Sequence, residues 1–441
     1  MDTTLNQSSA AARINRLPIG PFHRGLMWLL GMVVFFDFAD TNSFSFASPV
    51  LLKAWHLQVS TIAMIVSATF IGMFIGSLVG GAVSDRIGRK RALVIATAWY
   101  AGFSLLNALV WNIASLFTTR LLTGVGISAM TVVGMTYVSE MFPARRRGAY
   151  QAWIMTIGLC GIPITAYVAR YCVPLAPWGW RLIFVWGSLG LLLLFFSGKL
   201  EESPVWYEQH GRFDEAEAVL ARIEASAGQL DSSVPSDSAT LQAKSSSEPA
   251  AHFRGRTVVL AIAWICQTLG FFGFTAWVPT LLVAHGFSIV HSLTWSSAMS
   301  IATVPGAAIA SVISDRWDRK WWITIFALLI ALSGLFYGLT FDARAIVFFG
   351  FLVEMFLHTI NPLLYAYTAE CYPTRVRNSG AGITYGSGRL ANAFGPLLIA
   401  FLFSHYGYSS VFIYITGLWL MVAITIGVFG IQSRELIHRS T

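Results

Sequence analysis

Charged residues are scarce in this sequence. Asp, Glu, Lys and Arg make up 11% of its 441 residues, whereas a soluble globular domain carries about 25%. Hydrophobic residues account for 56% of the chain. This balance excludes an ordinary soluble domain and indicates that most of the chain is embedded in lipid.

Cysteine is scarce as well. Cys160, Cys172, Cys266 and Cys371 show neither paired nor metal-ligand spacing, so we expect no disulfide framework and no metal. The sequence has no phosphate-binding loop and no nucleophile elbow, which disfavours nucleotide-driven pumps and hydrolases. We therefore expect neither a cofactor nor enzymatic activity. The polar segment 1–21 lacks the apolar stretch of a signal peptide.

Long apolar runs dominate what is present. A membrane-spanning helix needs about 20 apolar residues, and lipid cannot satisfy the open edge of a strand. The sequence therefore predicts an all-α membrane protein with twelve transmembrane helices. Their expected ranges are 25–46, 61–83, 92–111, 113–138, 149–171, 181–198, 257–283, 292–313, 321–339, 345–368, 379–403 and 409–430.

Basic residues are distributed unevenly between the connecting segments. With the N-terminus inside, 23 Lys and Arg residues fall on the inner side and four on the outer side, namely Lys53, Arg170, Arg181 and Arg344. Cytoplasmic loops of membrane proteins are enriched in positive charge, so we expect both termini in the cytoplasm and the chain in a cell membrane, the inner membrane in a bacterium. This placement explains the net charge of +8 without a nucleic-acid partner.

Five regions follow from this pattern. They are an N-terminal tail (1–24), an N-terminal six-helix bundle (25–198), a cytoplasmic interdomain loop (199–256), a C-terminal six-helix bundle (257–430) and a C-terminal tail (431–441). The loop begins with aromatic and aliphatic residues interleaved with charges, as in an interfacial helix. After Ala225 its composition turns to Ser, Ala, Asp and Gln, which is typical of a flexible linker.

Three short motifs recur at a single offset of 230 residues. Residues 84–90 (SDRIGRK) match 314–320 (SDRWDRK), 49–52 (PVLL) match 279–282 (PTLL), and 140–147 (EMFPARRR) match 370–377 (ECYPTRVR). A duplication of six spans explains all three matches. Parallel repeats of this kind are a known transporter plan in which the substrate site lies between the halves.

The first copy of the loop motif also follows a family pattern. Gly81-x-x-x-Asp85-Arg86-x-Gly88-Arg89-Lys90, and Arg120-x-x-x-Gly124-x-Gly126 in the fourth span, resemble two motifs of the major facilitator superfamily. In the second copy, Ser311 and Asp318 depart from the pattern. The resemblance covers nearly the whole chain. It implies two six-helix halves related by a pseudo-twofold axis, which work by alternating access.

Two further stretches narrow the resemblance. Glu202-Ser203-Pro204-Val205-Trp206 looks like an element of the sugar-porter branch, although Glu201 and Val205 depart from the usual residues. Phe36-Asp37-Phe38-Ala39-Asp40-Thr41 in the first span is similar to an element of the aromatic-acid:proton symporters and nicotinate transporters, with Phe38-Ala39 in place of a Gly-Phe pair.

Ionisable residues inside the expected spans are the main candidates for function, because a charge at the bilayer centre is energetically costly. Asp40 and Arg120 each lie about seven residues from the outer end of their spans, or roughly 10 Å deep, so they can pair. Asp37 lies one turn deeper, and two carboxylates this close do not both ionise cheaply. This geometry suits proton coupling, and the resemblance also implies a proton-linked acid in the first span with an Arg partner in the fourth. The alternative is a fixed buried ion pair.

The second half carries its own polar stripes. Glu354, His358, Asn361 and Tyr365 share one face of the tenth span, and Tyr385, Arg389 and Asn392 share one face of the eleventh. Arg389 could bind a substrate carboxylate as a planar fork or could simply neutralise Glu354. His358 could carry a second proton or serve as a hydrogen-bonding group. Other candidate substrate contacts are Gln151, Gln267, Phe36, Trp153 and Phe271.

A cytoplasmic charge latch is implied by the resemblance. In it, Asp85 would cap the eleventh span through the helix dipole. The alternative is a plain topology signal, which explains the basic residues but not the acids. The candidate gating residues are Asp85, Arg86, Arg89, Glu140, Arg145, Arg147, Asp315, Glu370, Arg375 and Arg377.

The sequence thus predicts a proton-coupled secondary symporter that imports a small organic anion, such as nicotinate or a benzoate-type acid. The expected partners are this substrate, protons and the lipid bilayer, and the expected functional unit is a monomer. Alternatives are a symporter of sugars or other neutral metabolites, a multidrug or cation exporter, and a transporter-like sensor. No signalling domain accompanies the spans, which disfavours the sensor.

Overall fold

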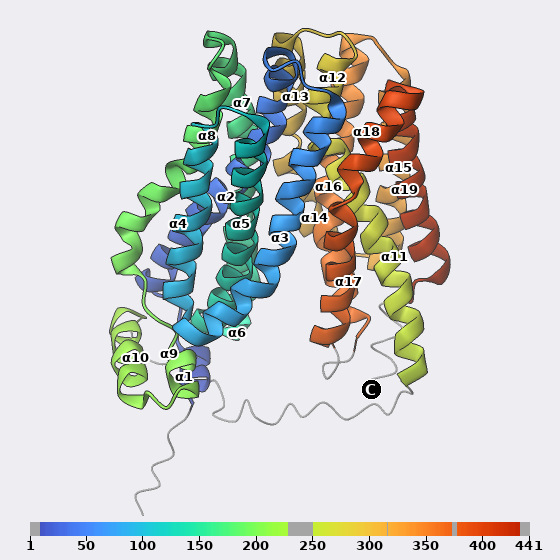
Figure 1. The fold of residues 1–441 in the computed structure, drawn as a ribbon. Coiled ribbons are helices and arrows are strands. Elements are labelled where there is room, and N and C mark those ends of the chain that lie inside the picture. Colours follow the sequence, from blue (N-terminus) through green and yellow to red (C-terminus); the bar gives the residue numbers. More distant parts are fainter. Residues whose placement is uncertain (1–8, 228–249, 315, 373–376, 433–441) are drawn as a thin grey trace, which may run out of the picture.

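A computed structural model describes residues 9–227, 250–314, 316–372 and 377–432 of the chain. These residues form helices and connecting loops with no strand (Figure 1). The first long helices are α2 (Pro21–Ala54), α3 (Val59–Ile87), α4 (Arg89–Asn107), α5 (Ile113–Met141), α6 (Ala144–Leu159), α7 (Gly161–Cys172), α8 (Trp180–Ser188) and η2 (Leu189–Lys199). The later ones are α11 (Ala250–Thr275), α12 (Val278–Ala284), α13 (Ile289–Ser300), α14 (Thr303–Ile313), α15 (Arg319–Leu339), α16 (Ala343–Glu370), α17 (Arg377–Asn392), α18 (Gly395–Tyr406) and α19 (Tyr408–Phe429).

Every expected span coincides with one or two of these helices. Eleven helical stretches within the described residues are long and apolar enough to cross a membrane. The expected span 92–111 corresponds to α4, which falls short of that criterion. Three basic residues, Arg89-Lys90-Arg91, occupy the first turn of this 19-residue helix and reduce its apolar length.

Prolines mark several places where a span is divided into two helices. Pro163 lies in the first turn of α7, Pro279 in the first turn of α12 and Pro396 in the first turn of α18. Proline has no N–H to donate and clashes with the preceding turn, so it is tolerated better at the start of a helix than in its interior. Pro49 and Pro362, in contrast, lie inside the continuous helices α2 and α16.

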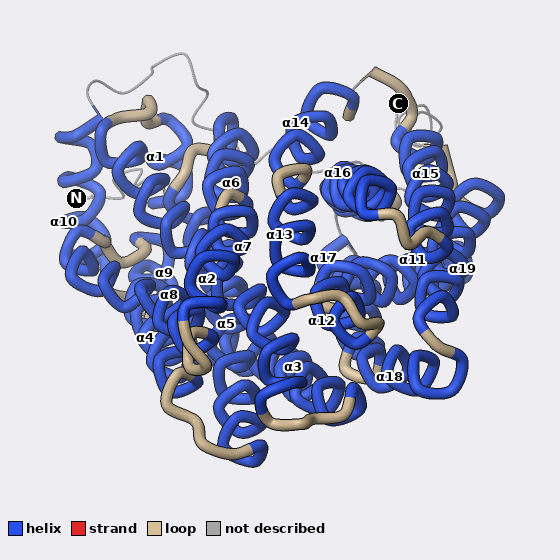
Figure 2. The backbone as a smooth tube through the Cα atoms, turned by 90° about the horizontal axis from the view of Figure 1, so that it is seen from above, coloured by secondary structure: helices blue, strands red, loops and turns tan. Residues whose placement is uncertain are grey.

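The helices form two groups, which lie side by side when viewed along their axes (Figure 2). The first group comprises α2 to η2 and the second comprises α11 to α19. Within the first group, α3 and α5 pack closely because Gly76 brings its backbone against Val125. A Cβ at Gly76 would collide with the Val125 carbonyl. Small residues permit such close helix packing in membranes.

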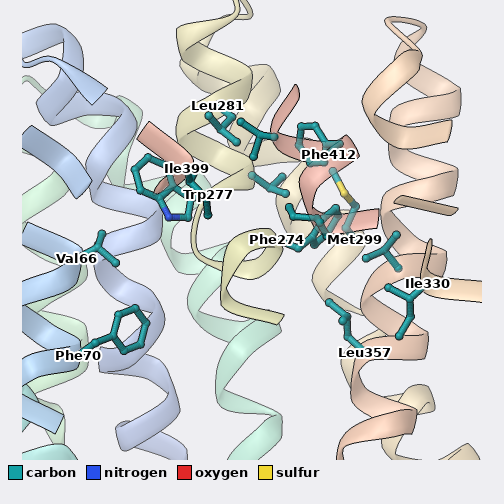
Figure 3. Close-up of a cluster of buried hydrophobic side chains, with 14 of the residues drawn as sticks. Val66, Phe70, Phe274, Trp277, Leu281, Met299, Ile330, Leu357, Ile399 and Phe412 are labelled. Carbon is teal, nitrogen blue, oxygen red and sulfur yellow. The ribbon is translucent and has the colours of Figure 1, made fainter. Parts of the chain in front are cut away.

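The two groups meet through α2 with α12, α7 with α13, and α3 with α18. A continuous cluster of buried apolar side chains crosses this boundary. Figure 3 shows Val66 and Phe70 of α3 beside residues of the second group such as Trp277 and Ile399. The Phe70 ring lies 4.9 Å from that of Phe272 of α11, in an edge-to-face contact.

We call the end of the molecule that carries the two loop motifs the basic end, and the opposite end the far end. Three short helices, α1 (Ala10–Arg16), α9 (Pro204–Gln209) and α10 (Phe213–Ala227), cover the first group at the basic end (Figure 1). The Arg13 guanidinium donates 3.0 Å hydrogen bonds to Glu224 and also bonds to Glu217. The hydrogen bond to Glu217 raises the pKa of Arg13. Arg13 of α1 thus binds α10, which contains part of the expected interfacial helix.

Candidate functional site

The loop motif at the basic end is built around Arg89. Its guanidinium contacts Glu140 at 3.1 Å and Asp85 at 2.6 Å. In the second copy, Arg319 contacts Glu370 and donates to Ser314 at 3.2 Å. Positions 89, 84 and 140 correspond to 319, 314 and 370 at the offset of 230, so both halves hold the same Arg–Glu contact between repeat-related helices.

The expected latch between the halves is not formed among the described residues. The contact between Arg89 and Glu140 lies within the first group, and the contact between Arg319 and Glu370 lies within the second. Arg86 and Arg145 are exposed, and Arg147 donates a 3.4 Å bond to the Phe142 carbonyl. The expected positions Asp315 and Arg375, and the side chain of Arg377, lie outside the described residues.

The substitution of Asp318 for Gly88 in the second copy has a structural explanation. Gly88 has φ +100°, and a Cβ there would collide with the Glu202 carboxylate. That carboxylate accepts a 2.9 Å bond from the Lys90 N–H and so caps the start of α4. In the second copy Asp318 caps α15 itself by accepting from the Lys320 N–H at 2.9 Å. A carboxylate therefore caps the helix in both copies, but it comes from Glu202 in the first copy and from Asp318 in the second.

Asp40 and Arg120 lie together inside the first group. Asp40 Oδ2 is 3.6 Å from Arg120 Nη1, Ser104 donates a hydrogen bond to Oδ1, and Asp40 is fully buried. The Arg120 Nε donates to Thr69 at 3.3 Å, and its guanidinium lies 5.4 Å from the centre of the Phe44 ring. Four helices, α2 to α5, thus supply the pair and its supports.

Arg389 extends from α17 of the second group to the first group. Its Nη1 donates to Ser128 Oγ of α5 at 3.1 Å. One turn further along α5, Thr131 donates a 3.5 Å bond to Asp37 Oδ2. Among the described residues no ion pair joins Arg389 to Glu354. Arg389 thus bridges the two groups, and its charge lies within electrostatic range of Asp37.

Glu354 has a different neighbour on its own helix. His358 Nδ1 lies 3.5 Å from Glu354 Oε2 and 2.9 Å from the Glu354 carbonyl. His358 is buried, and the Phe271 ring lies 5.4 Å from its imidazole. His358 Nε2 has no hydrogen-bond partner. The two ionisable groups expected on this stripe therefore form a local pair.

The second group contains an aromatic cluster on the helices α11, α16 and α17, the last of which also carries Arg389. The rings of Trp264, Tyr365 and Tyr385 lie 4.6–5.0 Å apart in pairs. Tyr365 is 44% exposed even though it belongs to this cluster, and its phenol lies within electrostatic range of Arg389. The sequence predicted both tyrosines but not Trp264, because nothing distinguishes one tryptophan among the chain's 16.

The remaining candidate residues are dispersed. Gln267 is buried and accepts a 3.2 Å bond from Thr268. Phe36 packs inside the first group, with its ring 5.8 Å from that of Trp186. Trp153 is exposed, Asn392 is buried, and Gln151 and Asn361 are half-buried.

Hydrogen bonds join the two groups at the far end. Ser48 Oγ lies 2.5 Å from Thr280 Oγ1, and the Arg170 Nε donates to Thr294 at 2.9 Å. Ser297 donates to the Ala166 carbonyl at 2.9 Å. No contact of this kind joins the groups at the basic end among the described residues. The far end is thus closed by hydrogen bonds of a kind that the described part of the basic end does not show.

Three comparisons with known proteins bear on this arrangement. YyaJ of Bacillus subtilis is 42% identical over 96% of this chain and 95% of its own length. The niacin transporter NiaP of Acinetobacter baylyi is 31% identical over 96% of this chain and 97% of its own length. The partially occluded, inward-open structure of the xylose transporter XylE from Escherichia coli has a TM-score of 0.75 at 17% identity, and covers 94% of this chain and 99% of that one. At that identity XylE shows the fold alone.

Residues 22–438 match the family described as sugar (and other) transporter. This match confirms the predicted resemblance to the major facilitator superfamily and the prediction that the chain is not an enzyme. The chain therefore belongs to the sugar (and other) transporter family of multi-span membrane proteins.

Proposed function

We propose that this protein is a proton-coupled symporter that imports an aromatic monocarboxylate, such as nicotinate or a benzoate-type acid, by alternating access. The observation that carries this proposal is Arg389. Its guanidinium bridges the two helix groups at Ser128 and lies within electrostatic range of the Tyr365 phenol, whose ring packs against Tyr385. A cation beside aromatic rings matches a ligand that has a carboxylate and a flat ring.

The proposed architecture has twelve spans arranged as two six-helix bundles, 25–198 and 257–430. Both termini and the basic end face the cytoplasm of a bacterial inner membrane, as the distribution of positive charge favours. The bonds between Ser48 and Thr280 and between Arg170 and Thr294 then close the outer side. In this state the site opens inward, and a single chain suffices for transport.

The gate at the inner side would close when the two bundles rock towards each other. In that state, charged residues of the first loop motif come within range of those of the second across the boundary. The residues are Asp85, Arg86, Arg89 and Glu140 in the first bundle, and Arg319 and Glu370 in the second. Each Arg–Glu contact already exists within its own bundle. A cross-bundle latch therefore requires only that Arg86, Arg145 or Asp85, which are exposed, find partners on the other side.

Chemistry supports an aromatic carboxylate as substrate. A guanidinium binds a carboxylate through two parallel hydrogen bonds, and aromatic rings stack at centroid distances of about 4.5–7 Å. The relative NiaP is described as a niacin transporter, and niacin combines a pyridine ring with one carboxylate. Proton coupling is assigned to the carboxylates of the first span, Asp37 and Asp40, together with Arg120.

A neutral sugar is the second candidate substrate. The family description includes sugars, and the buried Gln267 amide could hydrogen-bond hydroxyl groups. Against a sugar, Arg389 would then have no counter-charge from the substrate.

Thermal unfolding of the purified protein with added ligands separates the two candidates. Nicotinate and benzoate should raise the melting temperature, and xylose should not. Arg389→Ala should lose the carboxylate response, whereas the matched variant Arg344→Ala, at an exposed arginine of the far end, should keep it. A shift with xylose that persists in Arg389→Ala would favour the sugar symporter and contradict the proposal.

A further inference from the structure

The two carboxylates of the first span have unequal surroundings. Asp40 is fully buried and has two contacts: Ser104 donates a hydrogen bond to Oδ1, and Arg120 Nη1 lies 3.6 Å from Oδ2, which accepts no hydrogen bond. Arg120 is itself held by Thr69 and Phe44. Protonating Asp40 would leave the Arg120 charge buried without a counter-charge, which is strongly unfavourable. Asp40 is therefore suited to a permanent ion pair.

Asp37 has far weaker support. Its Oδ2 accepts one hydrogen bond, 3.5 Å long, from Thr131, and its Oδ1 is buried with no partner. No ion pair within 4.0 Å involves Asp37 among the described residues. An unpaired carboxylate oxygen in an apolar setting favours the neutral acid, because a buried charge without partners is costly. A proton can therefore bind to and leave Asp37 without breaking a pair.

Asp37 and Arg389 face adjacent turns of one helix. Ser128, which accepts from Arg389, and Thr131, which donates to Asp37, are three residues apart on α5, or about 4.5 Å along the axis. The Arg389 charge lies within electrostatic range of Asp37. The acid belongs to the first helix group and the guanidinium to the second, so any change in their interaction acts directly across the boundary that moves.

Few other charges interact with Asp37. Asp40 on the same helix interacts with it, and the phenol of Tyr100 from α4 lies near both carboxylates. Several other helices pack against α2. The ionisable side chains of α6, α7, α8 and η2 are Arg145, Arg146, Arg147, Tyr150, Tyr167, Arg170, Tyr171, Cys172, Arg181 and Lys199, and α5 adds Arg120, Tyr137 and Glu140. Among the described residues, Arg389 is the cation that interacts electrostatically with Asp37.

We propose that Asp37, and not Asp40, carries the coupled proton, and that ionised Asp37 competes with the substrate carboxylate for Arg389. This inference rests on the proposed function. With Asp37 ionised, a second carboxylate beside Arg389 meets electrostatic repulsion. A proton bound to an Asp37 oxygen removes that repulsion, so the anion binds Arg389 and one proton accompanies one monocarboxylate. When Asp37 releases the proton, the anion is expelled.

The test is the pH dependence of labelled nicotinate binding to the purified full-length protein. In the wild type, affinity should fall by up to about tenfold per pH unit as the pH rises, which is the slope of one linked proton. Asp37→Asn should bind at alkaline pH as tightly as the wild type does at acidic pH, with no slope. Asp40→Asn should retain the slope even if its stability is reduced.

The outcomes distinguish this inference from the proposed function. A sloped Asp37→Asn profile overturns the assignment of the coupled proton to Asp37, and so does a flat Asp40→Asn profile, because the proposal requires Asp40→Asn to retain the slope. A flat wild-type profile overturns it as well, while the substrate assignment stands. If the wild type binds neither nicotinate nor benzoate at any pH, the proposed function itself fails. If Asp37→Asn does not fold, Asp37→Ser removes the same charge and is expected to give the same flat profile.

Discussion

At the scale of single residues, Asp40 and Arg120 form the most enclosed ion pair of the described chain, with side-chain exposures of 0% and 2%. Asp40→Asn should destabilise the protein by about 3–5 kcal/mol, because it leaves a buried guanidinium unpaired. Thermal unfolding in detergent measures this effect. Asp40→Asn combined with Arg120→Gln should recover part of the loss, and Asp37→Asn should cost less than Asp40→Asn. Equal melting temperatures for Asp40→Asn and the wild type would contradict the pair's structural role.

Trp264 tests the aromatic cluster. Its ring lies 4.6 Å from Tyr365 and 4.7 Å from Tyr385. Trp264→Leu should weaken benzoate binding by about 0.5–1.5 kcal/mol, and should affect cyclohexanecarboxylate, which has no aromatic ring, much less. Trp111→Leu, at an exposed far-end tryptophan, is the matched control. An equal loss for both ligands would show that Trp264 acts through packing and not through ring recognition.

Residue-level prediction from the sequence succeeded where position within a span was enough. The Asp40–Arg120 contact followed from equal depth below the outer face, and the structure brings these side chains together. The bond from Arg389 to Ser128 could not be foreseen, because its partners are 261 residues apart and meet only when the two groups pack. The spacing placed Glu354 and His358 on one helix face, but the sequence offered Arg389 and not His358 as the partner of Glu354.

At the scale of elements, the segment 202–206 and the first loop motif form one unit. Glu202 caps α4, and the Trp206 Nε1 donates to the Asp85 carbonyl at 2.8 Å. Tyr137 also bonds to the Glu201 carbonyl. The sequence identified both segments as separate signatures. Their contact depends on the positive φ of Gly88, a backbone property that a single sequence does not reveal.

Gly88→Ala tests this unit. The added Cβ would strain a backbone at φ +100° and collide with the Glu202 carboxylate, so the cap on α4 should be lost at a cost of about 1–3 kcal/mol. Limited proteolysis should then cleave near α9 and α10 sooner than in the wild type. Gly102→Ala in α4, where nothing lies within 4 Å of the new Cβ, should leave cleavage unchanged. Wild-type cleavage of Gly88→Ala would refute the coupling between the two segments.

At the scale of the whole molecule, the far-end contacts predict how the two groups move. The hydroxyl oxygens of Ser48 and Thr280 are 2.5 Å apart. Each of these residues lies next to one of the repeat-related prolines, Pro49 and Pro279. If the protein works by alternating access, as we propose, this contact must break once in each cycle. Under the proposed function, the closed far end, with no equivalent bonds among the described residues of the basic end, corresponds to one end state of that motion.

A disulfide across this contact should arrest transport. In a background with the four native cysteines replaced by serine, Ser48→Cys with Thr280→Cys should cross-link and stop uptake, and a reductant should restore it. Each single variant should transport normally. Uptake by a fully cross-linked protein at the wild-type rate would show that the far end need not open.

The fold was largely predictable at this scale. Spans follow from apolar length and the duplication from three motifs at one offset, because lipid restricts the chain to helices. The division of several spans into two helices was less visible, since it depends on local packing around residues such as Pro163 and Pro396 as well as on the prolines themselves.

The central claim is proton-driven import of an aromatic carboxylate, and uptake of labelled nicotinate into proteoliposomes tests it most directly. With an inward proton gradient, nicotinate should accumulate above its external concentration, and a protonophore should abolish the accumulation. Arg389→Ala vesicles should show neither effect. Uptake that merely equilibrates, or that is unchanged by the protonophore, would contradict proton-coupled symport.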